Sequence, residues 1–285
     1  MPRQGSCMLY SWIGVMEQTL SYQAFLASPH HSIKHTSYFE TYDRLFSPYR
    51  GRPITFVEVG VLSGGSLFMW REFFGKDARI IGVDLNPNAK KWEASGFEIH
   101  IGSQSDPAFW RNLRQSVGQI DILLDDGGHS YAQQIITTES MLDAIRDGGL
   151  LVVEDTHTSY MDGFGPKKYF FIEYAKLLVD RINHRSGTFE GSKPETRIWS
   201  AQFFESIVAF HINRSASTEP SSVVANGKAS DGAADYRNFD RRDPWIDAIK
   251  GPLRPLLRLI PGSAAIKGWL RDRRETKRYG LDRFF

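Results

Sequence analysis

Five short apolar runs, separated by longer segments with helical spacing, constrain the fold of this chain most strongly. The runs are rich in Val, Ile and Leu, as expected of strands that are buried on both faces. They lie at residues 54–61, 79–85, 98–102, 120–126 and 149–155, and most end in small or acidic residues. Residues 66–74 and 131–146 have the spacing of crossover helices. The pattern predicts an α/β fold, with a Rossmann-like, mostly parallel sheet and helices on both faces.

The second half of the chain predicts a helix and a pair of strands that complete the sheet, followed by a linker and a tail of different composition. Residues 167–183 have helical spacing, and residues 198–204 and 206–212 read as a closing pair of antiparallel strands. From residue 213 the composition shifts to Ser, Ala, Gly, Asn and Asp, which favours a solvated linker. The predicted organisation is a helical acceptor-side segment at 1–50, the α/β domain at 51–212, a flexible linker at 213–240 and a basic amphipathic tail at 241–285.

Composition excludes several classes of protein. The 285 residues are 41% hydrophobic and carry a formal net charge of +2, so the chain can bury a full core and is not a wholly basic nucleic-acid binder. A single cysteine, Cys7, excludes an internal disulfide and a cysteine zinc site. No run of about 18 apolar residues or secretory signal is found, so we expect a cytoplasmic protein.

The tail at 241–285 differs from the rest in charge, with 12 Lys and Arg against 5 Asp and Glu. Large apolar and basic side chains alternate over residues 245–269, as in helices that lie on a membrane surface. Pro252, Pro255 and Pro261 would break a long helix. The tail therefore predicts either peripheral membrane contact or two short pieces that dock on the domain or on a second subunit of a homo-oligomer. Nucleic acid is not an expected partner.

The turn after the first predicted strand has the character of a cofactor site. Glycines at Gly60 and Gly64 allow close backbone approach, and Asp84, at the end of the second run, is placed to hold both hydroxyls of a ribose. The spacing is not that of a pyrophosphate turn, and Glu58 would repel a pyrophosphate. A cationic adenosine cofactor, S-adenosylmethionine, fits better. The predicted cofactor contacts are Glu58, Gly60, Ser63, Gly64, Ser66, Asp84, Ser103, Gln104 and Asp125.

Acidic residues follow the fourth and fifth runs, where neighbouring strand ends meet. Asp126, Glu154 and Asp155 would repel one another unless a cation neutralised them. Oxygen donors suit Mg²⁺, Mn²⁺ or Ca²⁺ better than zinc, so these three residues are the candidate metal ligands. His129, three residues after Asp126, is the candidate general base because histidine titrates near neutral pH. His35, Tyr38, His157 and Tyr160 are candidates for contact with the substrate.

Five motifs together resemble the class I S-adenosylmethionine-dependent methyltransferases: VEVGVLSGGS, GVDLNP, GSQSDPAFW, LLDDGGHSYAQQ and GGLLVVEDTHTSY. The resemblance covers residues 38–160. It is strongest to the metal-dependent sugar O-methyltransferases that modify macrolide deoxysugars and to relatives described as cephalosporin hydroxylase-like. The paired motifs D-D-G-x-H and E-D-x-x-T-S-Y are the distinctive part. Ser103 is a departure, since many relatives carry an acidic residue there.

The resemblance implies a function and agrees with the candidate residues. Asp126, Glu154 and Asp155 would hold Mg²⁺, His129 would act as the base, and the glycine turn would hold S-adenosylmethionine. The predicted activity is Mg²⁺-dependent O-methylation of a sugar hydroxyl in a glycolipid, a polysaccharide or a natural-product glycoside. Two alternatives remain open: a metal-dependent hydroxylase-like enzyme on the same scaffold, and a non-catalytic, membrane-peripheral binding protein.

Overall fold

The computed structural model describes residues 14, 16–186, 193–219, 221–229, 232, 269, 272–273 and 276–284. The chain divides into two units, Met1–Ser222 and Val223–Phe285. The first unit holds the whole sheet. In the second, the 3-10 turn η7 is described at Leu281–Phe284, and most of the predicted linker and tail lies outside the described residues. Within the described part of the chain, no helix combines the length and apolar character required to span a membrane.

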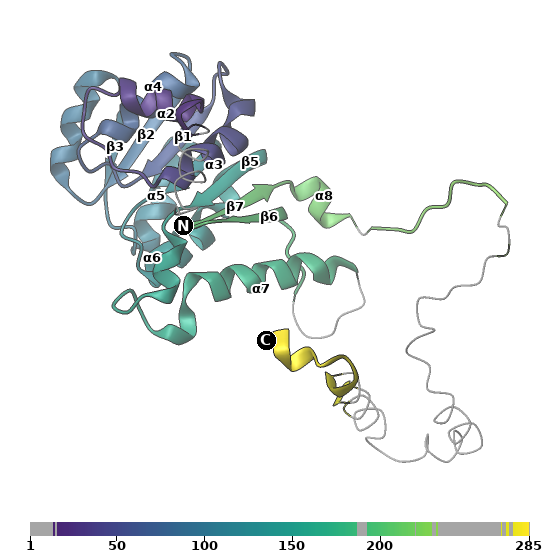
Figure 1. Ribbon diagram of the computed structural model, residues 1–285. Helices are drawn as coiled ribbons and strands as arrows, with labels where there is room; N and C mark the ends of the chain where they lie inside the picture. The colour runs from purple at the N-terminus through teal and green to yellow at the C-terminus, as the bar shows by residue number, and fades with distance from the viewer. Residues whose placement is uncertain are drawn as a thin grey trace, which may run out of the picture. The chain divides into compact units, whose positions relative to one another are not determined.

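A seven-stranded sheet forms the centre of the first unit (Figure 1), with strand order β3-β2-β1-β4-β5-β7-β6. Its strands are β1 Thr55–Val59, β2 Arg79–Asp84, β3 Glu98–Ile101, β4 Ile120–Asp125, β5 Ile145–Val153, β6 Ile198–Phe204 and β7 Ile207–Ile212. β1 to β5 pair in parallel, whereas β7 is antiparallel to both β5 and β6. This confirms the predicted Rossmann-like sheet and its antiparallel closing pair.

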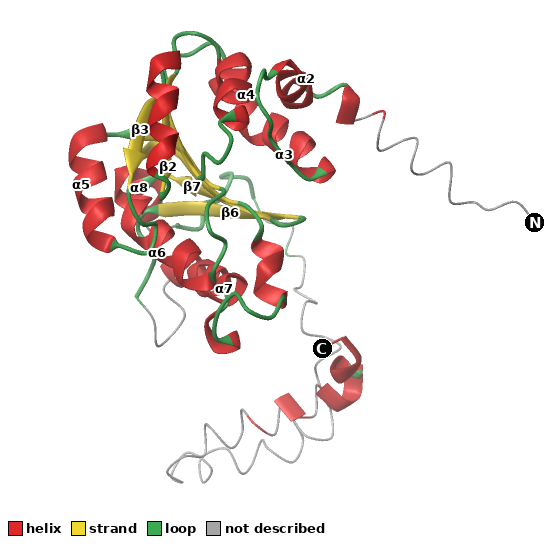
Figure 2. Ribbon diagram, turned by 90° about the vertical axis from the view of Figure 1, so that its left-hand side faces the viewer, coloured by secondary structure: helices red, strands yellow, loops and turns green. Residues whose placement is uncertain are grey.

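Helices cover both faces of the sheet, as Figure 2 shows. They are α2 Leu20–Ala27, α3 Thr36–Phe46, α4 Gly65–Phe74, α5 Pro107–Val117, α6 Tyr131–Met141, α7 Phe171–Asn183 and α8 Arg214–Thr218. Short 3-10 turns lie at η1 Ser47–Tyr49, η2 Pro87–Ser95, η3 Leu142–Ala144, η4 Thr156–Tyr160, η5 Lys167–Tyr169 and η6 His184–Ser186. One core lies between the sheet and α3 and α4, around Trp70. The other lies between the sheet and α5, α6 and α7, around Trp110.

Local signals set the starts of two crossover helices. Asp106 accepts a hydrogen bond from the Ala108 N–H, and Pro107 occupies the first turn of α5, where its missing N–H costs nothing. α6 begins with a capping box, in which Ser130 and Gln133 satisfy each other's backbone N–H groups. Asp106 lies five residues after the end of β3, and Ser130 lies five residues after the end of β4. The loops that carry the candidate site residues are therefore short.

Two predicted boundaries are wrong. The helix expected to reach residue 146 ends at Met141, because Ile145 is buried in the core and pairs with Ile120 as the start of β5. The linker expected from residue 213 begins later, because Asn213 caps α8 and Arg214 forms an ion pair with Asp147 at 2.8 Å. In both places, tertiary packing outweighs the local composition.

The sheet topology predicts where a ligand would bind. The chain order reverses between β1 and β4, and in open α/β sheets ligands bind at the carboxyl ends of the strands at such a switch point. The loops after β1, β2, β4 and β5 all lie at that edge, and they carry the acidic and glycine motifs.

Candidate active site

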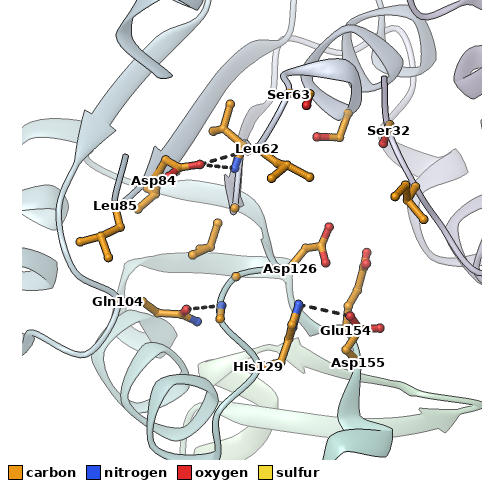
Figure 3. Close-up of a pocket in the computed structure, with 18 of the residues that line it drawn as sticks. Ser32, Leu62, Ser63, Asp84, Leu85, Gln104, Asp126, His129, Glu154 and Asp155 are labelled. Carbon is orange, nitrogen blue, oxygen red and sulfur yellow. Dashed lines mark hydrogen bonds and ion pairs between the residues drawn. The ribbon is translucent and has the colours of Figure 1, made fainter. Parts of the chain in front are cut away.

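A cavity of about 600 Å³ lies at this edge of the sheet. Its wall comes from the loops after β1, β2, β3, β4 and β5 and from the segment between α2 and α3. Figure 3 shows Asp84 on one side and Asp126, His129, Glu154 and Asp155 gathered on the other. We call the first side the glycine-turn end and the second the acidic end.

Asp84 organises the glycine-turn end through backbone hydrogen bonds. Its Oδ2 accepts from the N–H groups of Val61 at 2.8 Å and Leu62 at 3.0 Å. Its Oδ1 accepts from the Asn86 N–H at 2.7 Å. The carboxylate therefore fixes the β1–α4 loop and lines the cavity at the same time, as a ribose acceptor requires.

Gly60 brings the two ends of the cavity together. Its φ of +93° lies in the region that favours glycine, and a Cβ atom there would lie 2.1 Å from the carbonyl oxygen of Asp126. The Gly60 N–H donates to the carbonyl of Val83 at 2.8 Å. Only a residue without a side chain allows the turn to lie so close to the β4 loop.

The structure brings most of the predicted cofactor residues to the cavity wall. Those that line it are Gly60, Ser63, Ser66, Asp84, Ser103 and Gln104. The cavity lining does not include Glu58, Gly64 or Asp125. Glu58 is fully buried and accepts hydrogen bonds from Ser66 Oγ at 2.7 Å and Trp70 Nε1 at 2.9 Å. Burial raises the pKa of Glu58 to about 7, although the Lys34 charge opposes that rise.

Asp125 and Gln104 lock the β3 and β4 loops together. Gln104 Nε2 donates to Asp125 Oδ1 at 2.6 Å, and Gln104 Oε1 accepts from the Gly128 N–H at 2.9 Å. Burial raises the pKa of Asp125 to about 7. The buried Asp125 therefore holds Gln104, which lines the cavity, in its position.

The acidic end contains all three predicted metal ligands, but in two different environments. Asp126 and Asp155 keep about a fifth of their side-chain surface exposed, at 23% and 21%. Glu154 is fully buried. The donor atoms that lie within 4.8 Å of one another, close enough to share one ion, are those of Asp126, His129 and Asp155, so His129 stands in this group where Glu154 was predicted.

His129 and Asp155 face each other in the cavity, with 3.3 Å between His129 Nε2 and Asp155 Oδ2 (Figure 3). Both residues have a positive φ, of 56° for His129 and 52° for Asp155. Such backbone angles are uncommon for residues other than glycine and cluster at functional sites. The folded loops thus hold a histidine in contact with a carboxylate at the acidic end.

Two residues of the acidic end were not predicted from the sequence. The Lys34 side chain is 2% exposed, and its Nζ lies 2.6 Å from Asp126 Oδ2 and 3.0 Å from Glu154 Oε2. Burial acts to lower the pKa of Lys34, but the carboxylates around it outweigh burial and hold the pKa above its ordinary value. Tyr42, on α3, donates to the other oxygen of Glu154 at 2.5 Å.

The candidate substrate residues divide into two pairs. His35 and Tyr38 line the cavity. The Tyr38 hydroxyl donates to Asp155 and lies 2.9 Å from Ser206 Oγ. His157 and Tyr160 do not line it: His157 Nδ1 lies 2.5 Å from Ser206 Oγ, and Tyr160 is 73% exposed. Donor atoms of His35, Asp155 and His157 also lie within 4.8 Å of one another, at the exposed rim.

The donor chemistry fits a hard divalent cation. Carboxylate oxygens are the ligands that Mg²⁺ prefers, and the Lys34 ammonium between two of them shows that this place accepts a positive charge. The glycine-turn end fits an adenosine cofactor, since Asp84 offers a carboxylate beside a turn that no side chain blocks.

Comparison with known proteins agrees with this geometry. The family described as a methyltransferase domain matches residues 57–156. A solved structure of the MycE methyltransferase from the mycinamycin biosynthetic pathway, in complex with Mg and SAH, is 27% identical and superposes with a TM-score of 0.60. That match covers 68% of this chain and 54% of the other. Residues 57–156 therefore match a methyltransferase domain.

Two of the curated relatives are O-methyltransferases by name. An 8-demethyl-8-alpha-L-rhamnosyl tetracenomycin-C 2'-O-methyltransferase of Streptomyces olivaceus is 34% identical over 60% of this chain and 48% of its own length. The demethylmacrocin O-methyltransferase of Streptomyces fradiae is 32% identical over 50% of this chain and 39% of its own. The chain thus spans about half or less of the length of these relatives.

Proposed function

We propose that this chain is an S-adenosylmethionine-dependent O-methyltransferase that acts on a sugar hydroxyl and uses Mg²⁺. The observation that carries the proposal is one cavity with two chemically distinct ends. The glycine turn and Asp84 form one end, and His129 with its acidic neighbours forms the other. Two relatives act, according to their names, on a rhamnosyl tetracenomycin and on demethylmacrocin.

At the glycine-turn end, the residues of this chain bind and orient the cofactor. Asp84 lines the cavity and accepts the ribose hydroxyls in the proposal. The turn at Gly60 offers backbone groups at close range, and Ser63 and Ser66 add hydroxyls beside it. S-adenosylmethionine supplies a methyl group on a positively charged sulfur.

At the acidic end, Asp126, Glu154 and Asp155 would hold the divalent ion. When bound, Mg²⁺ lowers the pKa of a coordinated hydroxyl and orients it. The carboxylates would compensate the charge of the ion.

His129 removes the proton of the acceptor hydroxyl in the proposed reaction. Its Nε2 lies 3.3 Å from Asp155 Oδ2, so the carboxylate orients the ring and stabilises the imidazolium that forms. The acceptor oxygen then forms a bond to the methyl carbon as the carbon–sulfur bond breaks, and the proton stays on His129. Methyl transfer needs no further group, and positioning supplies much of the rate.

The acceptor in this proposal is a sugar of a glycoside. His35 and Tyr38 line the cavity, which supports the proposal that they contact the sugar. A natural-product glycoside, such as a deoxysugar on a polyketide, is the acceptor that the relatives favour. Membrane contact and self-association through the tail stay predictions, since residues 241–268 lie outside the described part.

Methyl transfer from labelled S-adenosylmethionine to a panel of rhamnosides and deoxysugar glycosides tests the proposal. We expect label in the sugar with wild-type protein and Mg²⁺, and much less label after chelation of the metal. Transfer to none of the panel, with the folded protein and cofactor present, would contradict sugar methylation. Transfer that persists in chelator would remove the metal from the proposal.

A further inference from the structure

Lys34 occupies the part of the site where the proposed function would place a cation. Its Nζ lies 2.6 Å from Asp126 Oδ2 and 3.0 Å from Glu154 Oε2, so one ammonium bridges two of the candidate metal ligands. The same nitrogen lies 5.7 Å from the centre of the Tyr42 ring. Because only 2% of its side chain is exposed, Lys34 is buried within the acidic end.

The segment that carries Lys34 is anchored firmly to the domain. Ser28 Oγ donates to the Gly65 carbonyl at 2.8 Å. A Cβ atom on Gly65 would lie 2.4 Å from the carbonyl oxygens of His30 and His31, so the absence of a side chain lets the segment lie against α4. The His30 ring packs on Trp92 at 4.5 Å between centroids. These contacts hold the Lys34 ammonium beside Asp126, which is 92 residues away in the sequence, and beside Glu154, which is 120 residues away.

A divalent ion and this ammonium cannot share the two carboxylates. Magnesium binds carboxylate oxygen at about 2.1 Å, so an ion held by both Asp126 Oδ2 and Glu154 Oε2 would touch the Lys34 nitrogen. Two positive charges at such a separation repel strongly in a buried place. Tyr42 donates to the other oxygen of Glu154, so both oxygens of this carboxylate already have a partner when Lys34 is in place.

We propose that Lys34 is an internal competitor of the divalent metal, so that ammonium and metal alternate between Asp126 and Glu154. Lys34 neutralises the acidic end when no metal is bound and weakens metal binding by occupying the place of the ion. Metal loading moves the Lys34 side chain out of its buried position. The inference rests on the proposed function, since it names what competes with the metal of that function.

Calorimetric titration of the full chain with Mg²⁺ tests this directly, without a methyl acceptor. The variants are Lys34→Met, which keeps the length of the side chain, and Lys34→Gln, which keeps a hydrogen-bond donor. Lys176→Met is the matched control, because Lys176 forms an exposed ion pair with Glu173 on α7. We expect both Lys34 variants to bind Mg²⁺ about tenfold more tightly than wild type, because a repulsive charge has been removed, and the control to bind like wild type.

The outcomes separate the inference from the proposed function. Equal or weaker Mg²⁺ binding by the Lys34 variants would overturn the competition while leaving a metal enzyme. Binding by the Lys34 variants but not by wild type would support the competition and contradict the metal in the proposed function. Absence of binding in every variant would overturn both.

Amine labelling of the wild-type chain gives a second test that needs no substitution. Lys34 is nearly inaccessible, whereas Lys167 is 81% exposed and serves as the internal reference. We expect acetylation of Lys34, read by mass spectrometry at low conversion, to rise several-fold in millimolar Mg²⁺ relative to Lys167. Labelling of Lys34 that does not change with Mg²⁺ would overturn the displacement.

Discussion

The two ends of the cavity are built in different ways. At the glycine-turn end, backbone groups carry the geometry: Asp84 holds the N–H groups of Val61 and Leu62, and Gly60 lies against the β4 loop. At the acidic end, side chains carry it. Lys34 and Tyr42 come from before the sheet and hold Glu154, which follows β5.

Because of this difference, we expect the two ends of the cavity to respond differently to substitution. A backbone turn is set by a few adjacent residues and fails when one atom is added in the wrong place. A cluster of charged side chains depends on contacts between distant segments, and each contact contributes a part of the total. We therefore expect one large effect at the turn and graded effects among the side chains.

Gly60→Ala should give the largest effect. The added Cβ would meet the Asp126 carbonyl oxygen at 2.1 Å, so we expect a loss of roughly 4–5 kcal/mol of unfolding free energy, as for the most damaging substitutions. Gly75→Ala is the matched control, because Gly75 has a similar φ of +96° but nothing within 4 Å. It should cost roughly 1–3 kcal/mol, the backbone strain alone. Urea denaturation measures both, and equal losses would contradict the steric argument.

His129→Asn tests the acidic end at its chemical centre. Asparagine tolerates the positive φ of this position but cannot act as the base, so we expect turnover to fall roughly 10²–10⁴-fold with cofactor affinity unchanged. His100→Asn is the control, since His100 also pairs with a carboxylate, Glu98, and is equally exposed at 26%. Initial rates at saturating cofactor measure the turnover of both variants. Wild-type turnover in His129→Asn would remove this histidine from the mechanism.

Glu58 lies behind the glycine-turn end and gives the protein a pH-dependent stability. Its native pKa of about 7 is above the ordinary value of 4.5, so the stabilising effect is complete below about pH 4.5 and is lost as the pH rises through 7. The shift corresponds to about 3 kcal/mol between these limits. Denaturation of wild type and Glu58→Gln at about pH 5 and pH 8 should show a smaller pH difference for the variant. Glu173→Gln, at an exposed position on α7, should keep the wild-type difference.

Tyr42→Phe should give the smallest effect. The variant loses one hydrogen bond to the Glu154 carboxylate, which is worth about 1.5–3 kcal/mol when one partner is charged. Tyr49→Phe provides the comparison, since its hydroxyl donates to the neutral Gly148 carbonyl at 2.6 Å and should cost about 1 kcal/mol. Thermal unfolding of the two variants ranks them. A larger loss for Tyr49→Phe would contradict the charged character of the acidic end.

The same difference explains what the sequence could reveal. The parallel strands, the turn at Gly60 and the acidic residues after β4 and β5 follow from local patterns, because a strand end and its loop are adjacent in the chain. The sequence predicts cofactor contacts for Glu58 and Asp125, but both side chains are buried. Glu58 accepts a hydrogen bond from Trp70, and Asp125 accepts one from Gln104, which itself lines the cavity.

Lys34 and Tyr42 could not be found in this way. Lys34 lies in an irregular segment between α2 and α3, 120 residues before Glu154 in the sequence. No helix or strand periodicity relates the two positions. Tyr42 lies on one face of an amphipathic helix, where an aromatic residue ordinarily indicates core packing. Only the tertiary fold shows that both side chains end on the same buried carboxylate.

Calorimetric titration with S-adenosylmethionine, with and without Mg²⁺ and with NAD as the control ligand, tests the central claim most directly. We expect saturable binding of S-adenosylmethionine at one site per chain and no binding of NAD. We also expect Asp84→Asn to bind S-adenosylmethionine more weakly while keeping its affinity for Mg²⁺. Absence of S-adenosylmethionine binding by the folded wild-type chain, or saturable binding of NAD in its place, would contradict the account.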